Sequence, residues 1–408
     1  MSMLPGTVQA QQNPVWFPFN GKSYFLLGVN YPWYNGYRSL DLGPYLGTKT
    51  IGSVGFVSSP RETLNIPPHD VPDAPTSVRP GTTGFNAEGI EKQFEDMHRI
   101  GIHVLRWFFG GDGRSVMIFD GSNRCTGVDS KALQNVDRVL TLAKDNDVYL
   151  VPVLFDFRFV CGDNWLRYED NSPVTGRADV IRDSDKRRAL IENFIKPLVK
   201  SCANSSAILY WEIMNEAGNV VQGIDPATGF TIGRRPMLRT RPMVSVVEMQ
   251  TFMNEAYDAI KSVDQAHPVM PSGLARPWQL PMIVGRVKAD LYGAHYNDDG
   301  SDFYRIRPVS AIRDDLFRRY KLTLDKPLVM TEGPALIQRH LAEYLNGAFD
   351  GGWAGYLPWS YYRLIGLSDL KRYPQIVTSN VNKPQAAANI DLYRAFNRSH
   401  AAAVKLGM

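Results

Sequence analysis

Short apolar runs alternate along this chain with stretches in which apolar residues recur every three or four positions. Gly89–Ile100 has the second pattern, and His103–Phe108 follows it as a short apolar run. The spacing predicts an amphipathic helix and the run predicts a buried strand. The runs that we assign to strands are Tyr24–Asn30, His103–Phe108, Val148–Phe155, Ala207–Met214, Pro268–Ser272, Asp290–Ala294, Pro327–Thr331 and Trp353–Pro358.

Helical patterns follow these strands in turn, so the chain reads as eight βα units. The predicted helices are Gly89–Ile100, Asp129–Asn146, Ser184–Cys202, Val244–Val263, Trp278–Val287, Ala311–Tyr320, Leu336–Phe349 and Asn389–Arg398. This order predicts an α/β fold, a (β/α)8 barrel forming a single domain over residues 1–408. The alternative, an open doubly wound sheet, lacks a Gly-rich phosphate turn after its first strand.

Turn-forming residues and long irregular stretches indicate how the predicted strands are connected. Asn20-Gly21 separates the alternating runs Val15–Phe19 and Tyr24–Leu27, which predicts a β-hairpin before the first barrel strand, and residues 1–14 read as an extended or disordered N-terminus. Long irregular stretches follow strands rather than helices, so we expect them to wall a deep cleft on the C-terminal face of the barrel. These stretches are Arg38–Phe85, Gly110–Val128, Arg158–Asp183 and Ala217–Met243.

Polar residues close two of the apolar strands. Asn215 and Glu216 follow Ala207–Met214, and Glu332 follows Pro327–Thr331. Burying such groups costs several kcal/mol unless they are hydrogen-bonded or used. Two carboxylates at the C-terminal ends of barrel strands suit retaining glycoside hydrolysis, in which one protonates the leaving oxygen and the other attacks the anomeric carbon. This reaction requires the two carboxyl groups to be only about 5 to 5.5 Å apart.

Trp211–Glu216 resembles the fourth barrel strand of clan A glycoside hydrolases, the retaining enzymes that include family 5 cellulases and mannanases. The resemblance implies that Glu216 is the general acid/base and that Asn215 bonds the sugar 2-hydroxyl. It implies that Glu332 is the nucleophile and that Arg106 lies against it. An Arg in an apolar strand must be paired, and the alternative partner is Glu212; both pairings can hold at once.

The end of strand eight matches the family pattern, whereas the ends of strands six and three depart from it. Family 5 enzymes commonly show His-x-Tyr on strand six, where this chain has His295 and Tyr296 side by side. Trp359 matches the position of the sugar-stacking platform on strand eight. Many family 5 cellulases end strand three in His, but here it ends in Asp156, which together with Arg106-Trp107 leans toward the mannanase branches.

Other residues near the strand ends are candidates for supporting the site. Asn30 ends strand one, and Trp33 and Trp107 are either sugar-stacking or packing residues, as are Tyr34 and Trp165. We therefore expect a retaining β-glycoside hydrolase acting on β-linked glucan or mannan. The alternatives are an exo-acting β-glycosidase or transglycosylase and, in another class, a non-catalytic carbohydrate-binding barrel.

The composition and charge of the chain limit the classes of partner that we expect it to bind. A net charge of +4 with dispersed basic residues does not point to nucleic acid, and the denser Arg234–Arg241 cluster reads as a solvated loop. The three cysteines lack metal-ligand spacing, although one disulfide is possible, and we expect no metal and no cofactor, because two carboxylates supply both proton and nucleophile. We find no membrane-spanning run and no leader pattern, so we expect a soluble protein, cytoplasmic or secreted after removal of a leader.

Overall fold

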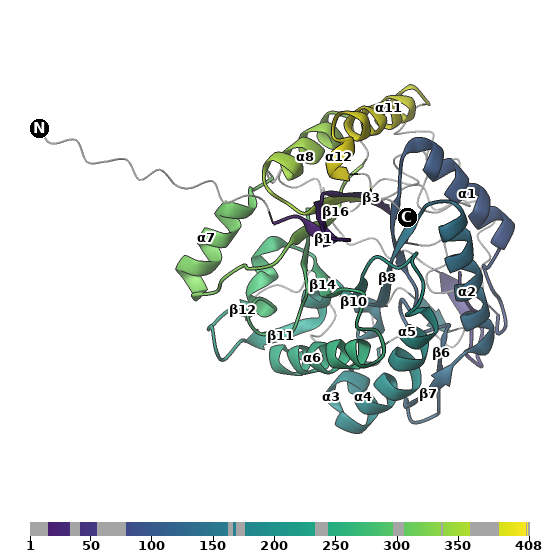
Figure 1. The fold of residues 1–408 in the computed structure, drawn as a ribbon. Helices are drawn as coiled ribbons and strands as arrows, with labels where there is room; N and C mark the ends of the chain where they lie inside the picture. The colour runs from purple at the N-terminus through teal and green to yellow at the C-terminus, as the bar shows by residue number, and fades with distance from the viewer. Residues whose placement is uncertain are drawn as a thin grey trace, which may run out of the picture.

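Eight parallel strands close into a barrel within a ring of helices, which confirms the predicted (β/α)8 fold (Figure 1). A computed structural model describes residues 15–32, 41–54, 79–161, 166–168, 176–232, 244–296, 306–335, 338–359, 383–404 and 406. The barrel strands are β3 (Leu26–Asn30), β5 (Val104–Phe108), β8 (Tyr149–Asp156), β10 (Trp211–Asn215), β14 (Val269–Leu274), β15 (Tyr292–His295), β16 (Leu328–Pro334) and β17 (Gly355–Trp359). They follow one another around the barrel in chain order, and β17 pairs with β3 to close it.

The helices lie close to their predicted positions. They are α1 (Ala87–Ile100), α2 (Ser130–Asp145), α3 (Ala178–Arg182), α4 (Ser184–Leu190), α5 (Lys196–Cys202), α6 (Val246–Val263), α7 (Val309–Tyr320), α8 (Gln338–Asp350), α11 (Lys383–Ser399) and α12 (Ala401–Val404). Asp129 caps α2, where its side chain accepts a hydrogen bond from the amide of Ala132. The buried side of each amphipathic helix packs on the barrel and so fixes its place in the ring.

Two predicted helices differ from the structure, and prolines account for both differences. Ser184–Cys202 is divided by a π-helical turn, η2 (Ile191–Ile195), just before Pro197, whose missing N–H cannot bond one turn back. The stretch predicted as Trp278–Val287 forms only a 3₁₀ turn, η4 (Pro277–Met282), which contains Pro281.

The predicted hairpin is present at the N-terminal end of the barrel. Strands β1 (Phe17–Phe19) and β2 (Lys22–Tyr24) pair antiparallel, and the Asn20-Gly21 turn has positive φ at both residues. Phe17 and Tyr24 pack in an apolar cluster with the first residues of several barrel strands. The hairpin therefore closes the barrel end away from the carboxyl ends of the strands.

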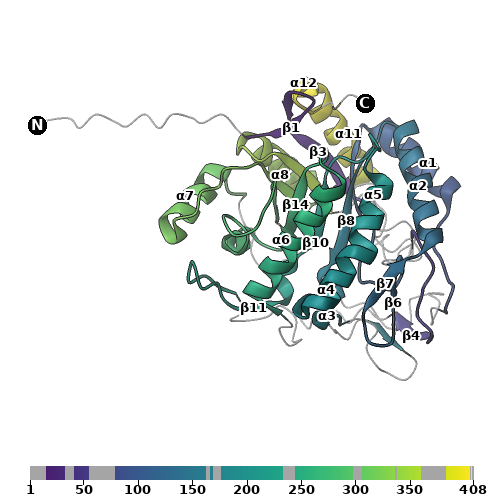
Figure 2. The ribbon, with the colours of Figure 1, turned by 60° about the horizontal axis from the view of Figure 1, so that its bottom comes forward.

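The long connections predicted as irregular contain short strands, which corrects that prediction. Stretches of two to four residues bounded by turns give too little periodicity to be recognised in sequence. Figure 2 shows β4, β6, β7 and β11 at the end of the molecule opposite β1 and α12. The added strands are β4 (Ile51–Val54) with β9 (Leu166–Tyr168), β6 (Met117–Phe119) with β7 (Cys125–Val128), and β11 (Val221–Ile224) with β12 (Thr231–Ile232) and β13 (Val244–Ser245).

Two further observations concern the cysteines and the helices. Cys125, Cys161 and Cys202 are all buried free thiols, so none forms a disulfide. Among the helices of the described ranges, none combines the length and apolar character needed to cross a membrane. The segments that contain residues 1–14 and the Arg234–Arg241 cluster lie outside the described residues.

Candidate active site

Glu216 lies at the mouth of the barrel, immediately after β10. Its backbone adopts the left-handed conformation (φ 50°, ψ 39°), which costs a non-glycine residue free energy and is held here by a hydrogen bond from its amide to the Gly273 carbonyl, at 2.8 Å. This conformation turns the chain out of the strand into the turn η3 (Ala217–Val220). The Glu216 carboxylate accepts a hydrogen bond from the Asn219 amide group at 2.8 Å and is 14% exposed.

Glu332 lies within β16 and is almost completely buried. The register with β15 shifts at this point, so that Ala294 is opposite Met330 whereas His295 is opposite Glu332. Such a bulge re-aims side chains at the rim of a barrel. It brings the Glu332 carboxylate next to the imidazole of His295.

His295 joins the two carboxylates. Its Nδ1 lies 3.0 Å from Glu216 Oε1 and 3.3 Å from Glu332 Oε2, and the imidazole is fully buried. One carboxylate oxygen of Glu216 and one of Glu332 lie within 4.8 Å of each other. Glu216, which follows β10, and Glu332, which lies within β16, therefore form a single buried cluster with His295.

Arg106 on β5 donates hydrogen bonds to four side chains around it. Its Nε and Nη2 bond both oxygens of Glu212, at 2.7 Å each, and its Nη1 bonds Glu332 Oε1 at 3.0 Å. Nη1 also donates to Asn30 Oδ1 at 2.9 Å, and Nη2 to Asn215 Oδ1 at 2.7 Å. The two pairings considered from the sequence, with Glu332 and with Glu212, are thus made simultaneously.

The pKa of each charged group follows from these contacts. Burial alone lowers the pKa of Arg106, but the charges of Glu212 and Glu332 outweigh it and raise the pKa further, so Arg106 is a permanent cation. Burial raises the pKa of Glu332. Burial acts the same way on Glu216, but the hydrogen bond and charge of His295 prevail and lower its pKa.

Two asparagines hold the strand ends together. Asn30 donates from Nδ2 to the carbonyls of Thr331 and Leu357, at 2.8 and 2.9 Å, and so links β3 to β16 and β17. Asn215 donates from Nδ2 to Asp156 Oδ2 at 2.8 Å. Each amide oxygen accepts from Arg106, so both residues fix the orientation of the guanidinium.

Solved structures of mannanases match this chain along most of its length. An endo-1,4-β-mannanase from Eisenia fetida has a TM-score of 0.62 at 18% identity, covering 94% of each chain. A β-mannanase from the blue mussel Mytilus edulis has a TM-score of 0.61 at 17% identity, covering 97% of this chain and 98% of that one. A β-1,4-mannanase from the sea hare Aplysia kurodai has a TM-score of 0.58 at 20% identity, covering 91% and 98%.

The chain has the fold of these β-mannanases. The comparison with solved structures carries this result alone, since no protein-family model and no curated protein matches the sequence.

Within this mannanase fold, Tyr296 lies apart from the carboxylate cluster. Its ring packs edge-on against Trp353, with centroids 5.6 Å apart, and its hydroxyl accepts a hydrogen bond from the Arg307 amide at 3.4 Å. His295 and Tyr296 are adjacent, so their side chains leave the strand in opposite directions. The sequence left the roles of these two residues open, because they are adjacent where the family pattern has one residue between them. In the structure, Tyr296 and His295 both line a cavity of about 250 Å³ together with Trp278.

The predicted aromatic platforms divide into two groups. Trp359 ends β17, is partly exposed and makes an edge contact with Phe108, at 6.3 Å between centroids. Trp107 is fully buried between Tyr31 and Phe94, so it belongs to the core and has no face for a sugar. Trp33 lies outside the described residues, as do Tyr34 and Trp165.

Asp156 belongs to the site although it is absent from the predicted set. It ends β8, where its Oδ1 accepts from Arg158 Nη1 at 2.9 Å and its Oδ2 accepts from Asn215. The signal was present in the sequence, because Asp156 closes an apolar strand as Glu216 and Glu332 do.

Gly273 gives the first testable prediction. A Cβ at this position would lie 2.6 Å from Thr331 Oγ1, 2.8 Å from His295 Nε2 and 3.0 Å from Glu212 Oε1. We therefore expect Gly273→Ala to displace His295 and to lower kcat by about 100-fold on an aryl glycoside. Gly127→Ala is the control, since its Cβ meets only the Ile118 side chain, at 3.7 Å. Equal activity of the two variants would show that the packing around His295 is not needed.

Proposed function

We propose that this chain is a retaining β-glycoside hydrolase that acts on β-mannan, with Glu216 as acid/base and Glu332 as nucleophile. The observation that carries the proposal is the approach of the two carboxylates to within 4.8 Å. Inverting enzymes keep their carboxyl groups about 6.5 to 9.5 Å apart to leave room for a water molecule, whereas retaining enzymes bring them to about 5 to 5.5 Å. The short separation supports a double displacement.

In the first step, Glu332 attacks the anomeric carbon while Glu216 gives its proton to the leaving oxygen. The glycosidic bond breaks, and a glycosyl ester forms on Glu332. In the second step, the ionised Glu216 removes a proton from water, the water oxygen attacks the same carbon, and the carboxylate of Glu332 leaves. Each step inverts the anomeric carbon, so the product keeps the β configuration.

The first step needs the proton on Glu216 and a negative charge on Glu332. His295 can contact either carboxylate, because its Nδ1 is almost as near to Glu332 as to Glu216. A small shift of the imidazole toward Glu332 weakens the bond that keeps Glu216 ionised. Arg106, held at 3.0 Å, then stabilises the negative charge on Glu332.

Mannan is the favoured substrate for two reasons. The solved structures named above are mannanases, and Asp156 ends β8 where many family 5 cellulases have His. β4 pairs with β9, so the connection after the first barrel strand is joined to the connection after the third. We infer that this joined pair walls the substrate site lengthwise, which favours cleavage within a chain; an exo-acting enzyme or transglycosylase is the alternative.

The anomer of the first product gives the second prediction. In NMR spectra recorded during hydrolysis of a β-1,4-mannooligosaccharide, we expect the β anomer to accumulate before mutarotation adds the α form. An initial α anomer would establish inversion and refute the double displacement. The same digestion, repeated on a panel of β-linked glucans and mannans, identifies the preferred sugar. Binding of mannan without any cleavage would instead support the carbohydrate-binding barrel.

A further inference from the structure

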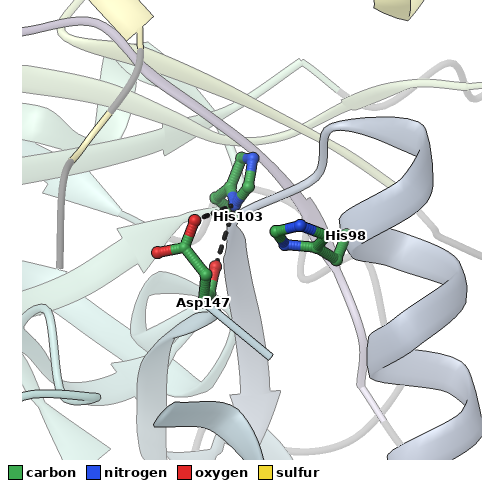
Figure 3. A group of neighbouring side chains, drawn as sticks. All are labelled: His98, His103 and Asp147. Atoms are coloured by element: carbon green, nitrogen blue, oxygen red, sulfur yellow. Dashed lines mark hydrogen bonds and ion pairs between the residues drawn. The ribbon is translucent and has the colours of Figure 1, made fainter. Parts of the chain in front are cut away.

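A second cluster of potential ligands lies at the opposite end of the barrel from Glu216. It consists of His98 in the last turn of α1, His103 just before β5, and Asp147 just before β8 (Figure 3). Each residue offers one nitrogen or oxygen atom, and the three atoms lie within 4.8 Å of one another. Because barrel strands run parallel, the starts of β5 and β8 are at the end away from the carboxylate cluster.

The distances around His103 resemble those between ligands of one metal ion. Its Nδ1 lies 2.8 Å from the main-chain oxygen of Asp147 and 3.3 Å from Asp147 Oδ2. Ligand atoms bound to a shared Zn²⁺ at about 2.1 Å are roughly 3 to 3.4 Å apart. Nδ1 now donates its proton to Asp147, so an ion would take the place of that proton.

The backbone around the cluster is held in place, whereas one side chain is free to adjust. Asp147 has a positive φ of 53°, which turns both its carbonyl and its carboxylate toward His103. The carbonyl of His98 accepts a hydrogen bond from the amide of Gly101, whereas the side chain of His98 is exposed. Its ring lies edge-on to that of His103, with centroids 5.3 Å apart. Because the three ligand atoms already lie within 4.8 Å of one another, only His98 would need to move to place all three around one ion.

We propose that His98, His103 and Asp147 form a binding site for a divalent transition-metal ion, of which Zn²⁺ fits best. Two imidazoles and a carboxylate suit Zn²⁺ and Co²⁺, whereas Mg²⁺ and Ca²⁺ prefer oxygen ligands. The ion would join the end of α1 to the start of β8. Since it would bind the folded chain only, it would stabilise the barrel without taking part in catalysis.

The third prediction concerns binding of Zn²⁺ to the full chain. In isothermal titration calorimetry we expect one Zn²⁺ per chain, with release of a proton, and a higher Tm in the presence of the ion. His98→Gln should weaken binding by at least about tenfold and abolish the rise in Tm. Glu95→Gln, which removes an exposed carboxylate of the same helix outside the cluster, should leave both unchanged.

The carboxylate cluster is the competing site, because Glu216, His295 and Glu332 also lie within 4.8 Å of one another. Titration of Glu332→Gln separates the two: the proposed site predicts unchanged stoichiometry and a Co²⁺ absorption spectrum identical to that of the unaltered chain. Asp147→Asn, which tolerates positive φ, should lose the spectrum. If Zn²⁺ binding survives in His98→Gln and disappears in Glu332→Gln, or if no Zn²⁺ binds, the proposal is refuted.

Discussion

Glu332→Gln is expected to lower kcat by roughly 10⁴-fold or more on every substrate, because the amide cannot form the glycosyl ester of the first step. The amide retains the shape of the carboxylate and can still bond Arg106, so the fold and the affinity for mannooligosaccharide should be preserved. Glu216→Ala should act differently. Its loss should cost about 10² to 10⁴-fold on mannan but far less on an aryl glycoside whose leaving group needs no proton.

Azide distinguishes the two roles. In Glu216→Ala a small anion can enter the space left by the side chain and attack the glycosyl ester, so azide should restore turnover of the aryl glycoside and yield a β-glycosyl azide. In Glu332→Gln no ester forms, and the amide fills the space, so azide should have no effect. Rescue of Glu332→Gln together with failure of Glu216→Ala would exchange the two assignments.

Arg106→Lys is expected to give the second-largest loss. Lysine keeps the charge but cannot bond both oxygens of Glu212 while reaching Asn215 and Glu332. We expect the free energy of unfolding to fall by about 3 kcal/mol, measured by urea denaturation. In this variant the contact between Glu332 and the cation is weaker, which raises the pKa of Glu332. Since Glu332 must be ionised to attack, the acid limb of the profile of kcat/KM against pH should move to higher pH.

Arg187→Lys is the matched control. Arg187 is also buried and bonds both oxygens of one carboxylate, that of Glu255, at 2.6 and 3.0 Å, but it lies between α4 and α6. We expect a loss of stability without any shift of the pH profile. If Arg106→Lys also left the acid limb in place, Arg106 would support the fold and not the charge state of Glu332.

The barrel and its two carboxylates could be predicted because each depends on a local pattern. Apolar runs separated by helical spacing predict βα units, and a charged residue at the end of such a run, as at Glu216 and Glu332, is too costly to be accidental. That Arg106 must be paired followed from its charge in an apolar strand, whereas Glu332 as its partner followed from the resemblance to clan A glycoside hydrolases.

The direction of single side chains was harder to predict. Both faces of a parallel barrel strand are buried, so apolar character does not separate the inside from the outside. Alternation would have separated them: Arg106 points to the carboxylates, so Trp107 must face the helices, and the same reasoning assigns Tyr296 once His295 is placed. Gly273 carried no signal, because its role depends on contacts with residues far away in the sequence.

The contact between the N-terminal and C-terminal segments of the described chain has a practical consequence. Phe25 donates its amide to the Ala403 carbonyl at 2.8 Å, and Leu406 packs in the same apolar cluster as the hairpin residues Phe17 and Tyr24. Both ends of the described chain thus meet beneath the barrel, while Glu216 lies at the opposite mouth. If the proposed activity is correct, immobilisation of the protein on a solid support through either of these segments would leave the mouth of the barrel that holds Glu216 facing outward, open to a polymer much longer than the protein.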